Sequence, residues 1–264
     1  MDLPIEIFEI ILNYLSVEDI FNLSETSKHI NCLCKSSKTN KTVRVSKDQY
    51  NIIKNKWPKL KYFVDYPMTN IIDPKEFSNV YKLNLSNSQN LKDVSKLKNL
   101  HTLYLKRCKN VLDVSSLKNL HTLDISLTNI SDVSSLKNLH TLDISHCHNI
   151  TNISCLGNLY EINISYTGID NIDCLKNVKK INASGCYNLL SINEELNCDT
   201  IDLSHTRIIY VHNLKNVKNI CLSYSKVFDV KSLVNAEKLI MIGCPNVINF
   251  YKLVGKVKYL DWIP

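Results

Sequence analysis

The fold is decided by three consecutive segments that are near copies of one another: LHTLYLKRCKNVLDVSSLKN at residues 100–119, LHTLDISLTNISDVSSLKN at residues 120–138 and LHTLDISHCHNITNISCLGN at residues 139–158. Self-similarity at a short, fixed period is typical of a solenoid, in which each unit packs mainly on its neighbours. Units of 19 to 21 residues start at Val80, Leu100, Leu120, Leu139, Leu159, Val178, Cys198, Val217, Ala236 and Val257. Duplication therefore built this region of the chain.

Each unit begins with the pattern L-x-x-L-x-L-S, in which apolar residues alternate with polar ones. This period of two predicts a strand of about five residues with positions four and six facing inward. About 14 residues then remain for two corners and a return, which leaves little room for a helix of ordinary length. We therefore expect an extended or 3₁₀ outer side, closed by apolar residues such as Val114 and Leu117.

The ninth position of the unit is small or weakly polar throughout. It is occupied by Ser88, Cys108, Thr128, Cys147, Thr167, Cys186, Thr206, Ser225 and Cys244. In period and register the chain resembles the leucine-rich-repeat family across roughly residues 40–264, with the family's usual Asn replaced here by Cys, Thr or Ser. The resemblance implies a ninth residue that turns the chain out of the strand and bonds to backbone, and a parallel β-sheet on the concave face of the solenoid.

The repeat fades toward the N-terminus. A unit that starts at Leu60 places Phe63 and Phe77 where later units have leucine, and Val43-Arg44-Val45 followed by Trp57 indicates a degenerate first unit. We expect residues 41–79 to form degenerate capping repeats and residues 80–264 to form the regular repeats.

Residues 1–40 do not follow the repeat, and their apolar residues recur at helical spacing. Pro4, the S-x-x-D helix start at Ser16 to Asp19 and the break at Ser24 to Ser27 predict helices at 4–14, 17–23 and 26–36. The stretch resembles the F-box, on Leu3-Pro4-x-Glu6-Ile7, Ile10, Leu12, Leu15-Ser16, Asp19-Ile20, Leu23-Ser24, Ser27-Lys28 and Ile30. The expected fold class is thus an α/β repeat, with a three-helix F-box module at 1–40 ahead of the solenoid.

These two resemblances imply a non-catalytic adaptor subunit that recognises the substrate of an SCF-type (Skp1-cullin-F-box) E3 ubiquitin ligase. The residues that the F-box resemblance assigns to docking on a Skp1-like adaptor, and through it on a cullin, are Leu3, Pro4, Ile7, Ile10, Tyr14 and Leu15. In the alternative interpretation these residues only form a helical cap over the first repeat. The chain is then a leucine-rich-repeat scaffold or decoy that recruits no ligase.

Composition narrows the class of protein further. The 264 residues are 44% hydrophobic and carry a net charge of +7, and only five are glycine, which excludes collagen-like and Gly-rich phosphate-binding sequences. The start, Met1-Asp2-Leu3-Pro4, has neither a basic nor an apolar signal region, and no run of about 18 apolar residues is present. We expect a cytoplasmic or nuclear protein with reduced cysteines and no membrane contact.

The sequence predicts no catalytic site, no metal site and no cofactor. Common hydrolase, nucleotide-binding and zinc-protease signatures are absent, and Cys32-x-Cys34 has no second pair at zinc spacing. His101, His121 and His140 share position two of their units, where we expect them to stack about 5 Å apart. A histidine ladder is also a candidate site for a divalent metal, but copying of the whole unit favours solvated side chains at a sheet edge.

Much of the positive charge lies in lysines that precede the last Asn of a unit. They are Lys98, Lys118, Lys137, Lys176 and Lys215. A nucleic-acid site normally adds interleaved aromatic or Arg residues, and Arg is scarce here, so a solvated edge is favoured over a nucleic-acid partner.

The target-binding surface is predicted from strand alternation. Positions three, five and seven are expected to face the concave surface, with position eight at its rim. Position seven is nearly always Ser, whereas Tyr and Arg, which are enriched at binding hot spots, occur at positions five and eight. The predicted target-binding residues are Tyr104, Arg107, Asp124, Leu127, Asp143, His146, Tyr166 and Tyr224.

Overall fold

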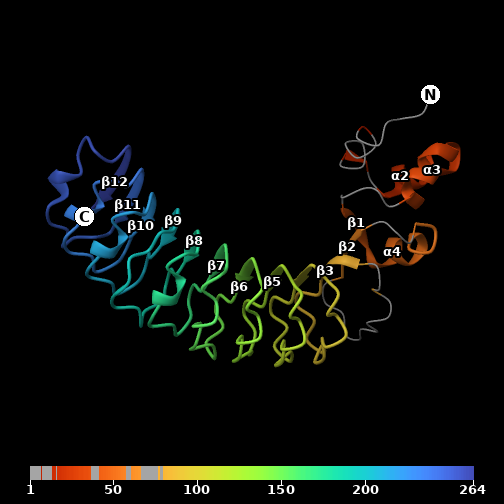
Figure 1. Ribbon diagram of the computed structural model, residues 1–264, viewed down its shortest axis with the longest axis horizontal. Coiled ribbons are helices and arrows are strands. Elements are labelled where there is room, and N and C mark those ends of the chain that lie inside the picture. The colour runs from red at the N-terminus through yellow and green to blue at the C-terminus, as the bar shows by residue number, and fades with distance from the viewer. Residues whose placement is uncertain are drawn as a thin grey trace.

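The computed structural model describes residues 7, 14–15, 17–36, 42–57, 61–66, 77 and 80–264. Two helices, α2 (Val17–Thr26) and α3 (Lys28–Ser36), precede a solenoid. Figure 1 shows an arc with these helices at one end and the C-terminus at the other. The predicted helix at 4–14 lies mostly outside the described residues.

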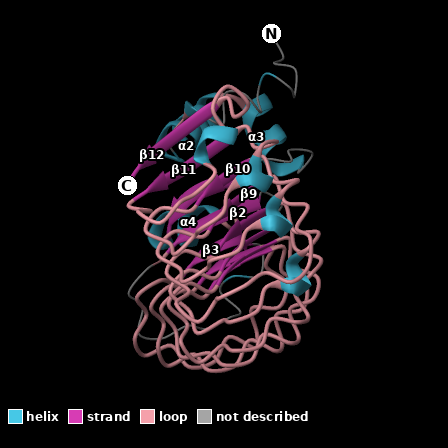
Figure 2. Cartoon of the chain, turned by 90° about the vertical axis from the view of Figure 1, so that its left-hand side faces the viewer, coloured by secondary structure: helices cyan, strands magenta, loops and turns pink. Residues whose placement is uncertain are grey.

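The described strands form one parallel sheet of twelve strands, each paired with the next strand along the chain. The strands are β1 (Thr42–Ser46), β2 (Lys61–Asp65), β3 (Val80–Asn84), β4 (Thr102–Tyr104), β5 (Thr122–Asp124), β6 (Thr141–Asp143), β7 (Glu161–Asn163), β8 (Lys180–Asn182), β9 (Thr200–Asp202), β10 (Asn219–Cys221), β11 (Lys238–Ile242) and β12 (Tyr259–Ile263). Equivalent repeat positions face each other in register, such as Leu103, Leu123 and Leu142. Figure 2 shows the strands stacked side by side, with loops closing each coil.

The strands β4 to β10 have three residues each, which is shorter than the predicted five. The chain leaves the strand at position six because positions six to nine form a tight turn. In the coil of β4, for example, the Cys108 N–H donates to the Leu105 carbonyl at 2.9 Å, and Arg107 has a φ of 61°. A positive φ at the third residue of a turn is the geometry of type II.

The interior follows the predicted register. Positions four and six are buried in the regular repeats, as Leu123 and Ile125 illustrate, except in the last coil, where Leu260 and Trp262 are half-buried. Val114 and Leu117 close the coil of β4 from the outer side. One hydrophobic core runs from Ile20 in α2 through the whole solenoid. Stacking therefore supplies the burial that no single unit achieves alone.

The ninth side chain bonds to backbone, as the sequence predicted. The Thr128 hydroxyl donates to the Ile125 carbonyl at 2.6 Å, and the Cys147 thiol of the next coil donates to the same oxygen at 3.0 Å. Thr167 and Cys186 share the Ile164 carbonyl in the same way. These buried thiols have structural partners, which accounts for their recurrence along the chain.

The outer side of the solenoid is extended or 3₁₀, as predicted. The short 3₁₀ helices are η2 (Asp173–Leu175), η3 (His212–Leu214), η4 (Lys231–Leu233) and η5 (Phe250–Lys252). Their inward leucines, such as Leu175 and Leu214, are buried.

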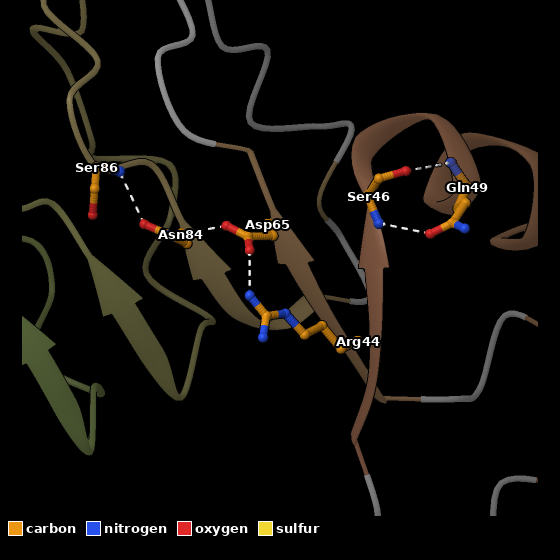
Figure 3. Close-up of polar contacts among 6 residues, drawn as sticks. All are labelled: Arg44, Ser46, Gln49, Asp65, Asn84 and Ser86. Atoms are coloured by element: carbon orange, nitrogen blue, oxygen red, sulfur yellow. Dashed lines mark hydrogen bonds and ion pairs between the residues drawn. The ribbon is translucent and has the colours of Figure 1, made fainter. Parts of the chain in front are cut away.

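The first coil contains a two-turn helix, α4 (Lys47–Ile53), that the repeat pattern did not predict. It starts with a capping box: the Gln49 N–H donates to Ser46 Oγ at 3.2 Å, and the Ser46 N–H donates to Gln49 Oε1 at 2.9 Å (Figure 3). The signal was present in the sequence as S-x-x-Q, which satisfies two free donors at a helix start. Val43 and Trp57 of this coil are buried as predicted.

Candidate interaction surfaces

The helices that precede the solenoid are joined to it by a buried contact. Ile20 of α2 and Cys34 of α3 lie in the same core as Tyr50, Trp57 and Tyr62 of the first two coils. Tyr50 and Tyr62 pack edge to face, with ring centroids 5.2 Å apart. Burial raises the pKa of the Cys34 thiol to about 12, so this group stays neutral inside the joint.

Polar contacts reinforce this joint at its border. The Trp57 indole N–H donates to Asn31 Oδ1 of α3 at 3.3 Å, and Lys56 forms an ion pair with Glu25 of α2. Together with the shared core, these contacts fix how α2 and α3 sit on the solenoid.

The residues that the F-box resemblance assigns to adaptor binding are partly visible. Leu3, Pro4 and Ile10 lie outside the described residues. Ile7 and Tyr14 are exposed, at 45% and 84%. Leu15 instead packs in part against the protein's own core. Ile7 and Tyr14 therefore have surface to offer a partner, and the assignment of all six stays a prediction.

Position five carries an Asp or Asn side chain in most repeats, and these side chains shape the turn after their strand. In the coil of β5, Asp124 Oδ1 accepts the Ser126 N–H at 2.8 Å, and Asp143 accepts the Ser145 N–H in the next coil. Some of these side chains also form hydrogen bonds between coils: Asn163 Nδ2 donates to Asp143 Oδ2 at 2.9 Å. The Asp and Asn types at this position thus have a structural role before any binding role.

The same row of Asp and Asn side chains begins in the first coils (Figure 3). Arg44 of β1 forms an ion pair with Asp65 of β2 at 2.6 Å, and Asn84 of β3 donates to the other oxygen of Asp65 at 2.8 Å. Asn84 in turn accepts the Ser86 N–H at 3.0 Å. This chain of contacts ties three neighbouring strands together on the exposed side of the sheet.

The middle of this face is hollowed and negatively charged. A hollow of about 320 Å³ lies over β6 to β9 and is lined by charged groups that include Asp143, Glu161, Lys180 and Asp202. Burial raises the pKa of Asp124, and the Asp143 charge acts in the same direction, against the Ser126 hydrogen bonds. Glu161 is paired with Lys180 at 3.4 Å, and Lys106 partly offsets the charge of Asp124, whereas Asp143 and Asp202 have no ion-pair partner among the described residues.

Position seven does not belong to the open concave surface, contrary to our expectation. The serines at this position are buried between coils at Ser126, Ser145, Ser165, Ser204 and Ser223. The strand has already ended at position five, so position seven is the first corner of the turn. Its carbonyl accepts a hydrogen bond from the preceding coil, as Ser126 does from the Arg107 N–H at 2.9 Å.

Position eight has the left-handed backbone in the nine coils that follow β3 to β11. The residues are Asn87, Arg107, Leu127, His146, Tyr166, Gly185, His205, Tyr224 and Gly243, with φ between 55° and 68°. Their side chains stack between coils: His146 lies on Tyr166 with ring centroids 4.7 Å apart, and His205 lies on Tyr224 at the same distance. Within the predicted target-binding set, the structure therefore brings His146 and Tyr166 into direct contact.

Each of these tyrosines also covers a glycine in the following coil. A Cβ atom added to Gly185 would lie 2.6 Å from the Tyr166 ring, and one added to Gly243 would lie 2.5 Å from the Tyr224 ring. The sequence carried this signal, because both glycines follow their tyrosine by one repeat, but the sequence reasoning missed it. Each ring thus packs between the coils on either side of it, and 39% of Tyr166 and 54% of Tyr224 stay exposed.

The remaining members of the predicted target-binding set lie on neighbouring coils. Tyr104 is half-buried and tilts against Phe63 at a centroid distance of 6.1 Å, while Arg107 is exposed. Asp124, Leu127 and Asp143 are half-buried.

Position two carries a second stack, which confirms the predicted histidine ladder and extends it. Tyr81, His101, His121, His140 and Tyr160 follow one another with centroid distances of 4.4 to 4.8 Å. Each imidazole Nδ1 lies 3.2 to 3.3 Å from the hydroxyl of the next residue, a threonine. Within the described residues, no three His, Cys, Asp or Glu side chains are grouped closely enough to hold a metal ion.

Comparisons with known proteins match this architecture. The F-box domain family matches residues 1–42. Among curated proteins, none matches the chain in sequence. No described helix combines the length and apolar character needed to cross a membrane.

Solved structures share the fold of the solenoid. An internalin (inlF) from Listeria monocytogenes aligns with a TM-score of 0.61 at 20% identity, over 83% of this chain and 69% of its own. The APL1 leucine-rich repeat domain aligns with a TM-score of 0.53 at 17% identity, over 79% of this chain and 61% of its own. A chain of the mouse RP105/MD-1 complex aligns with a TM-score of 0.52 at 14% identity, over 76% of this chain and 47% of its own. At these identities the likeness shows the fold, a leucine-rich-repeat solenoid.

Proposed function

We propose that this chain, an F-box domain joined to a leucine-rich-repeat solenoid, is the substrate-recognition adaptor of an SCF-type E3 ubiquitin ligase. F-box domains generally bind Skp1-like adaptors, and F-box proteins with leucine-rich repeats are typically non-catalytic interaction adaptors. The F-box match at residues 1–42 carries the proposal. The shared core of α2, α3 and the first coils supports it, because a rigid joint holds a captured target at a fixed distance from the ligase.

In this function the chain supplies proximity and orientation rather than chemistry. A target bound to the solenoid is presented to the ubiquitin-transfer machinery at a high effective concentration. A flexible joint would spread the target over many positions. The buried Trp57 and its bond to Asn31 restrict that spread.

The proposed target site remains the concave face and its rim, through Tyr104, Arg107, Asp124, Leu127, Asp143, His146, Tyr166 and Tyr224. Because the rings of Tyr166 and Tyr224 pack between coils, their hydroxyl groups are the contacts to expect. Carboxylates in the neighbouring column favour a target that presents Lys or Arg.

Point variants test adaptor binding better than removal of residues 1–40, because that deletion would uncover Tyr50, Trp57 and Tyr62. The full chain is co-purified with a purified Skp1 protein, and the affinity is measured by calorimetry. We expect Tyr14→Ala to weaken binding about tenfold, the loss of one hot-spot contact. Tyr251→Ala, which removes a tyrosine of 71% exposure at the far end of the solenoid, is the matched control.

Two outcomes decide between the adaptor and the scaffold. Binding that is lost on combined Leu3→Ala and Pro4→Ala substitution, with an unchanged melting temperature, supports the adaptor. A folded chain that fails to bind Skp1 while other F-box proteins bind it rejects ligase recruitment and leaves the scaffold or decoy. Once a target is known, combined Ala substitution of Tyr104, Arg107 and Tyr166 should abolish its capture and leave Skp1 binding intact.

A further inference from the structure

One outward-facing position in the return segment of each coil changes its chemistry along the solenoid. In the first five regular repeats it is occupied by Lys92, Leu112, Ser131, Thr151 and Asp170. In the next four repeats it is occupied by Leu190, Ile209, Phe228 and Ile248, which are 55%, 41%, 44% and 42% exposed. We refer to these four residues as the outer apolar stripe.

The stripe is continuous from coil to coil. The Phe228 N–H donates to the Ile209 carbonyl at 3.2 Å, and the Ile248 N–H donates to the Phe228 carbonyl at 2.7 Å. Tyr210 pairs in register with Asp229, and Asp229 pairs with Ile248, so the backbone segments of Ile209, Phe228 and Ile248 are directly adjacent and about 4.8 Å apart. Leu190 holds the equivalent position of the coil before them, so the four residues span about 14 Å. Exposed apolar residues scattered singly are ordinary, whereas a contiguous row of them marks an interaction surface.

A hollow adjoins the stripe. It has a volume of about 370 Å³ and is lined by Tyr210, Val211, His212, Phe228 and Lys231, among others. Tyr210 is 61% exposed at its border. A hollow of this kind can receive a side chain of a partner, whereas a flat or protruding apolar surface cannot.

The border of the stripe is positively charged. Arg207 and Lys226 each lie two residues before a stripe residue, separated from it by a buried inward residue, so strand alternation places them on the same side. Neither has an ion-pair partner among the described residues. The nearby Asp229 carboxylate is already engaged by Lys231 at 3.0 Å and by Asn249 at 2.9 Å.

We propose that the outer apolar stripe binds an acidic amphipathic helix of a partner protein. Apolar side chains of that helix would cover the stripe and enter the hollow, and its carboxylates would pair with Arg207 and Lys226. A helix advances 5.4 Å per turn, so about two and a half turns cover the 14 Å of the stripe. This surface goes beyond the adaptor function, since it involves neither the F-box nor the predicted target-binding residues.

The test uses a fluorescein-labelled synthetic peptide with Leu at positions i, i+3, i+4 and i+7 and Glu on the opposite face. Its binding to the full chain is followed by fluorescence anisotropy, beside a scrambled peptide and a version with Lys in place of Glu. We expect the acidic peptide to bind best, with an affinity that falls as salt rises. Phe228→Ser and Ile209→Ser should each weaken it about tenfold, the loss of one large apolar contact.

The chain offers a matched control at the same repeat position. Leu112→Ser removes a leucine of 63% exposure from the first half of the solenoid and should leave peptide binding unchanged. Lys226→Glu should weaken the acidic peptide and strengthen the Lys version. Melting temperatures and Skp1 co-purification of all variants show that fold and F-box are intact.

Three results would overturn the proposal. One is equal affinity for the acidic and scrambled peptides, and another is an equal loss in Leu112→Ser and Phe228→Ser. The third is Phe228-dependent sedimentation with phosphatidylserine vesicles in the absence of peptide binding, which would identify a membrane surface instead. None of these results depends on Skp1 binding, so the adaptor function is tested independently.

Discussion

The repeats at residues 80–177 and those at residues 178–264 share an interior but differ in their exteriors. Both sets bury the same two columns, which consist of Leu and Ile apart from residues such as Ala183 and Met241 in the second set, and both place a hydrogen-bonding Ser, Thr or Cys at position nine. Outside, the first set exposes few large apolar side chains: Leu112, Tyr160 and Tyr166. The second set exposes Tyr187, Leu190, Ile209, Tyr210, Tyr224, Phe228, Ile248, Tyr251, Val254, Tyr259 and Ile263.

This difference shows that stacking of the coils constrains the inward positions much more than the outward ones. An inward residue contacts the coils before and after its own, so any change there affects three units. An outward residue packs against other coils only where it joins a stack, as Tyr224 does on His205, and elsewhere its type is free to change. In the described part of the chain, no such stack includes the four residues of the outer apolar stripe, which is why we assign them to a partner.

The largest expected effect tests whether the two interiors are equivalent. Leu123 and Ile220 occupy position four in the two sets and are 1% and 2% exposed. Replacing either with Ala should lower the free energy of unfolding by about 2–5 kcal/mol, the cost of a large-to-small change in a packed core. Chemical denaturation measures it, with the half-buried Thr122→Ala as the control. A cost at Ile220 similar to that of Thr122→Ala would show that the second set is packed differently.

A smaller effect concerns the left-handed position eight, which is filled by a residue larger than Gly in all five coils of the first set but by Gly185 and Gly243 in two coils of the second. Gly185→Ala should cost about 1–2 kcal/mol for the backbone alone, since the left-handed region is unfavourable for residues with a Cβ. The Tyr166 ring, 2.6 Å from the added Cβ, should raise this cost further.

A double-mutant cycle isolates the ring contribution. In a Tyr166→Ala background, Gly185→Ala should cost only the backbone part, and the coupling should disappear. Gly168→Ala is the control, because its Cβ would meet no atom closer than 4.0 Å. Equal costs with and without the Tyr166 ring would contradict the stacking of Tyr166 on Gly185.

The predictable features of the fold are those that spacing encodes. The period, the inward positions and the role of position nine repeat along the chain, so residues such as Leu123 and Cys147 were placed correctly. The stack of His101, His121 and His140 was predicted for the same reason. Spacing does not encode where a strand ends. Because the strands have three residues rather than five, the serines at position seven lie in the turn and are buried between coils.

Contacts between different residue types were harder to predict. The Tyr166 ring over Gly185 depends on two positions one repeat apart, and neither residue is unusual within its own unit. The α4 helix interrupts the first coil through a local capping signal at Ser46 and Gln49, which overrides the repeat. Of the site residues, Tyr104 and Arg107 stay predictions, since exposure alone does not identify a partner.

The smallest expected effect concerns acidity, and it belongs to the first set of repeats. Burial lowers the pKa of His101, and His121, Lys82 and Lys61 lower it further. Burial also lowers the pKa of His121, with His140 acting in the same direction. Both pKa values thus lie below the value of about 6.5 found in an unfolded chain. As the pH falls below 6.5, the unfolded chain takes up protons before the folded chain does.

The stack therefore contributes stability that is complete above about pH 6.5 and is lost as the pH falls through the folded pKa values. Both imidazoles are partly solvated, which keeps the effect small. Amide hydrogen exchange should show β4 to β6 opening more readily at mildly acidic pH, and His101→Gln with His121→Gln should remove that dependence.

Asp124 has the opposite effect on stability. Its raised pKa makes the folded state bind a proton before the unfolded chain does, so acid stabilises the fold at that site. This opposite effect starts as the pH falls through the raised pKa of Asp124 and is complete below the usual Asp value of about 3.9, so the histidine substitutions are needed to separate the two effects. A loss of protection that survives the double Gln substitution would assign the acid sensitivity to another group.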